Sequence, residues 1–140
     1  MLKDWPIILI VVSNVIYQIC SKSSPKELHP LAMLVITYLI GALSSFIAYH
    51  ILAPNANIVA EYKHLNWTAF VLGVAVVGLE SGYLYLYKLG WNINTGYMVV
   101  SILIAISLLF VGLFLYNESI SLTKILGIVV CLIGMFLLRK

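Results

Sequence analysis

The sequence has few charged residues and no polar stretch long enough to form a soluble domain. Only 9% of its 140 residues are charged, whereas 63% are hydrophobic, and the mean hydropathy is +1.08. Soluble globular domains carry about 25% charged residues, so the composition excludes that class of protein. In a membrane protein, the net charge of +3 indicates orientation in the membrane or contact with lipid headgroups rather than binding of nucleic acid.

Cysteine is scarce as well, and its two occurrences give no sign of a disulfide or a metal site. Cys20 and Cys131 lie within apolar, helix-like segments, and their spacing matches no metal-binding motif. We expect both to be small buried hydrophobic side chains. The sequence also has no nucleophile triad and no phosphate-binding loop. This argues against an enzyme, and we expect no cofactor, no metal and no nucleic acid partner.

What the sequence does contain is a series of five apolar windows. Windows of about 17–25 apolar residues can cross a bilayer as helices, because a helix satisfies its own backbone hydrogen bonds in lipid. The predicted helices cover residues Trp5–Ser21, Leu31–Ala53, Trp67–Lys88, Thr95–Tyr116 and Leu122–Leu138. The predicted fold class is therefore all-α: an integral membrane protein in which residues 1–140 form a single domain, a bundle of five transmembrane helices.

An odd number of membrane-spanning helices places the two termini on opposite sides of the membrane. Three Lys or Arg residues would then lie on the N-terminal side and five on the other side. This weak bias favours a cytoplasmic C-terminus and would allow insertion in both orientations. One such chain is small for a translocation pathway, since transport sites usually lie between two repeats of inverted topology. An antiparallel pair of chains would supply that arrangement.

The predicted helix Trp67–Lys88 contains one carboxylate, Glu80, among apolar, aromatic and small residues. An ionisable side chain at that depth is costly, so it usually faces a cavity, a partner or a pathway. Helical spacing places Tyr83 and Tyr87 on the same face as Glu80. A carboxylate among aromatic rings suits a cation. Glu80 could equally be a protonated acid that is hydrogen-bonded to a tyrosine. Tyrosines in membrane helices are also ordinary packing residues.

Polar residues gather on one face of the first predicted helix. Asn14, Tyr17, Gln18 and Ser21 follow one another at intervals of three or four residues, which places them on a common stripe. This stripe predicts the lining of a cavity. The alternative is a set of hydrogen bonds between helices that only hold the bundle together.

Small residues form a stripe on the last predicted helix. Gly127, Cys131 and Gly134 recur at helical spacing on one smooth face, and such faces suit a close helix contact. The contact could join two subunits or two helices of one chain.

Three segments carry a resemblance to known membrane proteins. Leu115–Leu137 has an acid after the fourth helix, a short polar turn and two glycines seven residues apart; Tyr85–Tyr97 has Lys88 before Asn-Thr-Gly; and Asn14–Lys22 is a first helix that ends in lysine. With these segments, nearly the full chain resembles one five-helix EamA-type repeat of the drug/metabolite transporter superfamily. The resemblance implies a membrane transporter.

The first helix and the last three also resemble the four-helix small multidrug resistance proteins, which work as antiparallel homodimers. Those proteins bind protons and cationic substrates with a glutamate in the first helix, and Asn14 stands at the matching place here. If this chain is coupled to protons, Glu80 would have to bind them. By the same resemblance, Gly127 and Gly134 lie where that family pairs its subunits. The run Gln18–Lys22 is similar to small flippase subunits that move lipid-linked aminosugars.

These features together predict a small-solute transporter that works by alternating access, as a homodimer, with coupling to protons. The predicted substrate-binding and proton-binding residues are Asn14, Tyr17, Gln18, Glu80, Tyr83 and Tyr87. The expected partners are the lipid bilayer, a small molecule that is a cation or another metabolite, and a second copy of the chain. The alternatives are a flippase for a lipid-linked substrate and a non-transporting accessory or structural subunit. The expected location is the plasma membrane of a prokaryote, as a multi-pass protein.

Overall fold

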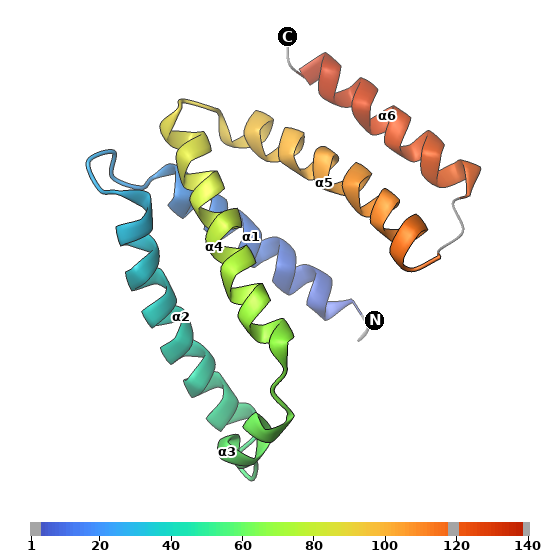
Figure 1. Ribbon diagram of the computed structural model, residues 1–140. Helices are drawn as coiled ribbons and strands as arrows, with labels where there is room; N and C mark the ends of the chain where they lie inside the picture. Colours follow the sequence, from blue (N-terminus) through green and yellow to red (C-terminus); the bar gives the residue numbers. More distant parts are fainter. Residues whose placement is uncertain (1–3, 118–120, 139–140) are drawn as a thin grey trace. The chain divides into compact units, whose positions relative to one another are not determined.

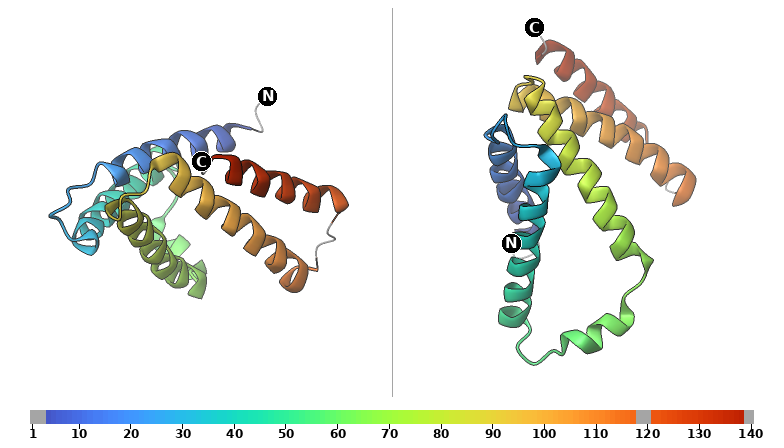
Figure 2. Two further views of the ribbon diagram at one scale, coloured as in Figure 1. Left: turned by 90° about the horizontal axis from the view of Figure 1, so that it is seen from above. Right: turned by 60° about the vertical axis from the view of Figure 1, so that its left-hand side comes forward.

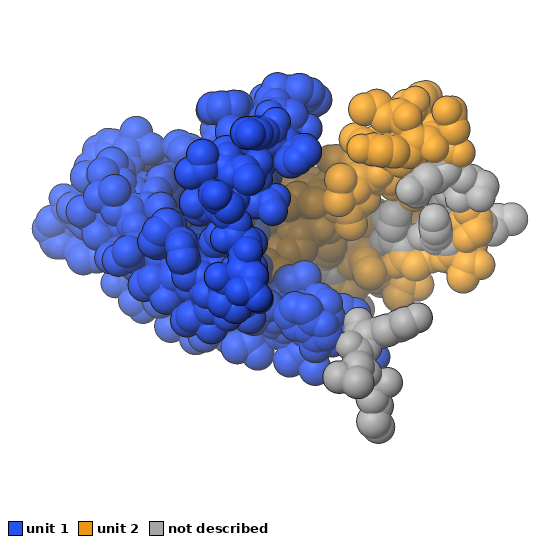
Figure 3. Space-filling view, turned by 90° about the horizontal axis from the view of Figure 1, so that it is seen from below, with its two compact units in different colours: residues 1–88 blue, residues 89–140 orange. Residues whose placement is uncertain are grey.

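The chain separates into two compact units, each with its own helix contacts. The computed structural model describes residues 4–117 and 121–138. Unit 1 comprises residues 1–88 and unit 2 comprises residues 89–140 (Figure 3). The prediction of one domain over the whole chain stays a prediction.

Unit 1 contains three long helices and a short helical link. Its elements are α1 (Trp5–Lys22), α2 (Pro30–Leu52), α3 (Ile58–Glu61), the 3₁₀ turn η1 (Tyr62–His64) and α4 (Trp67–Lys88) (Figure 1). Pro6 and Pro30 lie in the first turns of α1 and α2, where a missing backbone N–H costs nothing. Asn66 begins α4, because its side-chain oxygen accepts a hydrogen bond from the Thr68 amide at 3.0 Å.

Unit 2 is a pair of helices in contact, α5 (Ile93–Leu115) and α6 (Leu122–Leu138). The link before α5 turns at Gly90, whose φ of 94° is a backbone conformation that glycine adopts readily. Glu118, the acid of the predicted closing pattern, lies outside the described residues.

The predicted all-α membrane fold is confirmed. Within residues 4–117 and 121–138, four helices are long and apolar enough to cross a membrane: α1, α2, α4 and α5. Each begins and ends within two residues of its predicted bounds. The fifth predicted helix also forms, as α6, but with 17 residues it is shorter than these four. Its role as a membrane span stays a prediction.

Within unit 1, α4 packs against both α1 and α2. The contacts concentrate at the end where α1 and α4 finish and α2 starts, since Leu34 of α2 and Leu84 of α4 are buried there. Towards α3, α2 and α4 diverge (Figure 2). The first half of α4 is accordingly open, with Phe70 and Val74 exposed by 68% and 75%. In a membrane, such apolar surface faces lipid or another helix.

The α1–α2 link is fastened to the end of α4. Lys88 donates a hydrogen bond from Nζ to the carbonyl oxygen of Lys26 at 2.9 Å and another to that of Leu28. The Tyr85 hydroxyl lies 3.4 Å from Nε2 of His29, and the two rings meet edge to face. These contacts hold the ends of α1, α2 and α4 together on one side of unit 1.

The small core of unit 1 makes a testable prediction about its stability. Leu84 is 2% exposed, so Leu84→Ala leaves a void where side-chain contacts stood. We expect the free energy of unfolding to fall by about 1–3 kcal/mol, measured by thermal or denaturant unfolding in detergent. Leu79→Ala is the matched control, since Leu79 is 51% exposed on the same helix, and it should change little. Equal losses in both variants would contradict this core.

Candidate functional site

The polar stripe of α1 faces α4 at the closed end of unit 1, which is the end where α1 and α4 finish and α2 starts. Gln18 and Ser21 are only 4% and 5% exposed, and Asn14 and Tyr17 are half-buried. Because α4 is the helix that packs against α1, the stripe turns away from lipid and into unit 1. This is the arrangement expected of polar residues in a membrane helix, where lipid cannot satisfy their hydrogen bonds.

Opposite this stripe, α4 presents stacked aromatic side chains. Tyr83 and Tyr87, one turn apart, are both buried, and their rings stack with centroids 6.2 Å apart. Tyr17 of α1 meets Tyr83 edge to face, with centroids 5.9 Å apart and planes at 79°. Edge-to-face contacts of this kind stabilise aromatic pairs beyond the area that they bury. These ring contacts form the aromatic side of the polar cluster.

The cluster also contains a buried hydrogen bond and a cation beside an aromatic ring. The Tyr87 hydroxyl donates to Oε1 of Gln18 at 2.5 Å, and this pair is buried. Nζ of Lys22 lies 5.6 Å from the centre of the Tyr87 ring, within the range of a cation–π contact. The other end of the Gln18 amide, Nε2, is buried and has no hydrogen-bond partner among the described residues.

Glu80 lies deeper in the membrane span, on the same face of α4. It lies eight positions before the helix end at Lys88, which is about 12 Å along the axis. The side chain is half-buried, and within the described part of the chain its buried Oε2 makes no hydrogen bond. A buried polar atom without a partner is uncommon in native structures and calls for an explanation, such as a bound ion, water or ligand.

Tyr38 of α2 approaches Glu80 from the other side. Its hydroxyl is close enough to act on the Glu80 carboxylate as a side-chain hydrogen-bond partner, but the contact lacks the geometry of a well-formed hydrogen bond. Tyr17 also interacts electrostatically with both Glu80 and Tyr38. Side chains from α1, α2 and α4 thus converge on one carboxylate.

The structure brings together most of the residues that the sequence pattern predicts for the site. Successive contacts link Tyr17 to Tyr83, Tyr83 to Tyr87, and Tyr87 to Gln18. Glu80 interacts with Tyr17 of this cluster. Asn14 is on the same face of α1, one turn before Tyr17, and is half-buried. Their roles in binding stay predictions.

The sequence analysis did not identify Tyr38 as a candidate site residue. Tyr38 lies one turn after the buried Leu34, so it shares the face that α2 turns to α4. The sequence does not show which face of α2 turns to α4, because the polar residues of α2 do not gather on one face.

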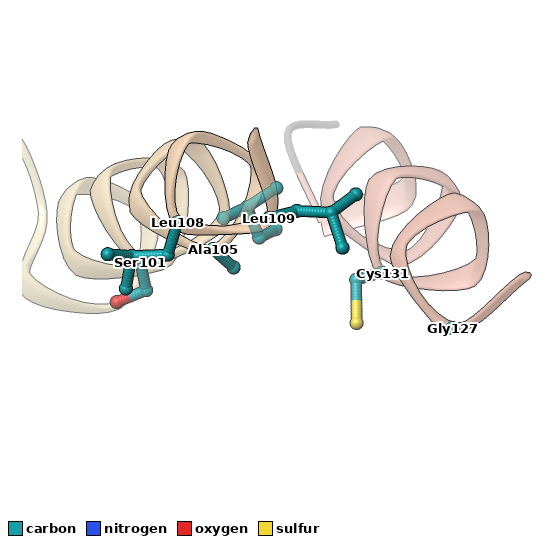
Figure 4. A pocket seen from close by; sticks show the side chains of 7 residues that line it. Ser101, Ala105, Leu108, Leu109, Gly127 and Cys131 are labelled. Carbon is teal, nitrogen blue, oxygen red and sulfur yellow. The ribbon is translucent and has the colours of Figure 1, made fainter. Parts of the chain in front are cut away.

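The small-residue stripe of α6 belongs to unit 2. Gly127 and Cys131 line a shallow apolar groove of about 570 Å³ with residues of α5, including Ser101 and Ala105 (Figure 4). Cβ atoms built at Gly127 and Gly134 would meet nothing within 4 Å in the described structure. The close helix contact that the stripe predicts is therefore not made within the described residues.

The two cysteines correct a prediction. Cys20 and Cys131 are both exposed on the surface of the chain, whereas the sequence predicted buried side chains. In a membrane helix the exposed face contacts lipid, which is as apolar as a protein core, so an exposed thiol loses little there. Nor do the described residues hold a group of three or more His, Cys, Asp or Glu side chains that could bind a metal ion.

The comparisons with known proteins agree with this membrane architecture. No curated protein and no solved structure matches the chain. The family model of the EamA-like transporter family matches residues 2–140, which is nearly the entire sequence. The chain is therefore a multi-pass membrane protein that belongs to the EamA-like transporter family.

Proposed function

We propose that this protein carries a small organic solute across the plasma membrane of a prokaryote by alternating access, as a homodimer coupled to protons. The observation that carries the proposal is Glu80, a carboxylate deep in a membrane helix whose buried oxygen has no hydrogen-bond partner among the described residues. Intramembrane carboxylates are costly and are kept where they bind ions, protons or substrates. The membership in a transporter family supports the same function.

In this mechanism Glu80 alternates between a proton and a cationic group of the solute. Tyr17 and Gln18 of α1 line the site together with Tyr83 and Tyr87 of α4, and Asn14 lies at its rim. Because one carboxylate cannot hold a proton and a cation at once, binding of the solute releases the proton. This competition couples the two movements in opposite directions.

A second copy of the chain completes the pathway. Transport sites usually lie between two repeats related by inverted topology, and this chain resembles one repeat. An antiparallel homodimer supplies the second repeat, and the weak charge bias of the chain permits both insertions. A reporter fused to the C-terminus tests this point: signals from both sides of the membrane support antiparallel pairs, and signal from one side only contradicts them.

The proposal is tested with purified protein, first by binding and then by flux. A thermal-shift screen against metabolites and organic cations at several pH values should find solutes that raise the melting temperature in a pH-dependent way. Those solutes should then drive protons out of proteoliposomes that contain a pH-sensitive dye. Stabilisation by lipid-linked sugars without proton movement would support the flippase alternative. No solute movement, with Glu80 substitutions that lower only stability, would support an accessory subunit.

A further inference from the structure

Unit 1 has an open groove between the second half of α2 and the short helical link that follows it. The groove has a volume of about 790 Å³. Its lining comes from α2, with Ala42, Leu43, Phe46 and Tyr49 among others, and from the link, with Glu61 of α3 and Tyr62 of η1. These residues are distinct from the cluster around Gln18 and Glu80, so the groove is a second candidate site.

The groove runs from the interior of the membrane towards its surface. On α2, Ala42 lies seven positions before Tyr49, which is about 10 Å along the axis. Because α2 and α4 are both spans, the link that joins them lies at the membrane surface. Ala42 and Leu43 therefore lie at the depth of the acyl chains, whereas Glu61 lies at the depth of the headgroups.

The surface end of the groove combines a carboxylate with aromatic rings. Glu61 is exposed there, and Tyr49 and Tyr62 line the groove beside it. The ring of His50 contacts those of Phe46 and Tyr49, with centroids 4.2 and 5.5 Å apart, so the aromatic side of the groove is held in place. A carboxylate next to aromatic faces attracts an organic cation, and ammonium groups are the usual ligand of such sites.

We propose that this groove binds a phospholipid whose headgroup carries an ammonium group. The ammonium lies at Glu61 and the tyrosine rings, and an acyl chain follows α2 towards Ala42. Lys63, two residues after Glu61 in η1, adds a positive charge at the surface end, which suits the phosphate of such a headgroup. This lipid is a bound partner of the chain and not the transported solute.

Other occupants fit the groove less well. An anionic lipid without an ammonium group would place its charge against Glu61 and gain nothing from the aromatic faces. A small amine from water would fill the surface end only and leave the apolar end, about 10 Å long, uncovered. A phospholipid with an ammonium headgroup matches both ends in the order in which the membrane presents them.

The experiment compares two lipids with identical acyl chains, phosphatidylethanolamine and phosphatidylglycerol. Native mass spectrometry of the delipidated full chain, with each lipid titrated in detergent, measures the Kd of the first bound lipid. An exposed ion pair and an exposed cation–π contact are each worth about threefold in affinity. We therefore expect phosphatidylethanolamine to bind about tenfold more tightly. Glycerophosphoethanolamine, which has the headgroup without acyl chains, should not displace it.

Substitutions then locate the binding. Glu61→Gln removes the charge at nearly constant size, so it should weaken phosphatidylethanolamine about threefold and not weaken phosphatidylglycerol. Tyr62→Leu removes a ring that is 61% exposed, so it should act in the same direction without harm to the fold. Glu27→Gln is the matched control, since Glu27 is exposed in the link between α1 and α2, and it should change neither Kd.

The opposite results overturn the proposal. Equal or tighter binding of phosphatidylglycerol by the parent chain would mean that the groove does not select an ammonium group. Glu61→Gln and Tyr62→Leu variants that leave both lipids unchanged, or weaken both equally, would place the selection elsewhere. Displacement of the lipid by glycerophosphoethanolamine would show that the groove takes a soluble amine and not a lipid.

Discussion

The Glu80→Gln variant is expected to lose proton-linked transport down to the level of protein-free vesicles, while it keeps its fold and the oligomeric state of the parent chain. Of the five acids in the sequence, Glu80 alone lies within one of the four described spans. Glutamine has nearly the same size and can still accept a hydrogen bond, but it cannot take up or release a proton. The change therefore removes the chemistry and leaves the packing in place.

The measurement is proton flux driven by a solute gradient in dye-loaded proteoliposomes, at several pH values. Glu27→Gln is the matched control, because it makes the same carboxylate-to-amide change in the link between α1 and α2, outside the spans, and it should transport at the normal rate. Size-exclusion chromatography of both variants checks the fold and the oligomeric state. Unchanged pH-dependent flux in Glu80→Gln would remove Glu80 from the mechanism.

The residual behaviour of Glu80→Gln is also informative. If solute exchange continues without a proton gradient, Glu80 couples the two movements but is not needed to bind the solute. If exchange stops as well, the carboxylate also supplies binding energy for the solute. The second result is the one expected from competition between a proton and a cation for one carboxylate.

The helices could be predicted from the sequence because one physical requirement determines membrane spans: the backbone must form its hydrogen bonds without water. A run of about 20 apolar residues must form a helix to satisfy its backbone in lipid, and α4 begins and ends at its predicted residues, Trp67 and Lys88. The short helix α3 in the link Pro54–Asn66 was not predicted. It has four residues, Ile58–Glu61, and is capped by Asn57, whose side chain accepts a hydrogen bond from the Val59 amide at 3.0 Å. Such a local cap has no signal in hydropathy.

The site could be predicted in part, for a different physical reason. Polar residues stand out against an apolar helix, so Gln18, Tyr87 and Glu80 could be identified, and helical spacing showed which of them share a face. Spacing does not show which helix lies opposite. The convergence of Tyr38 on Glu80 depends on the rotation of α2 about its axis, and that rotation is set by packing against α4. No residue pattern on α2 encodes it.

The second large effect is expected at α6, where Gly127→Leu and Gly134→Leu together should convert the proposed homodimer into monomers. Small residues allow two membrane helices to approach closely, and large side chains keep them apart. A Cβ atom added at either glycine meets nothing within 4 Å in the described part of the chain, so a larger side chain starts in open space. The substitutions should therefore leave the fold of one chain intact and act only on a partner.

The exposed thiol of Cys131 supplies the readout for this contact. Cys131 lies between the two glycines, near the middle of α6, so two copies of it would lie close together in a parallel or an antiparallel pair. In a Cys20→Ser background, a short thiol cross-linker should trap the dimer of the parent chain, and the double leucine variant should give little product. Gly73→Leu is the control, since a Cβ atom added there also meets nothing within 4 Å, but on α4. Cross-linking that survives both leucines, or that Gly73→Leu abolishes equally, would place the subunit contact elsewhere than on α6.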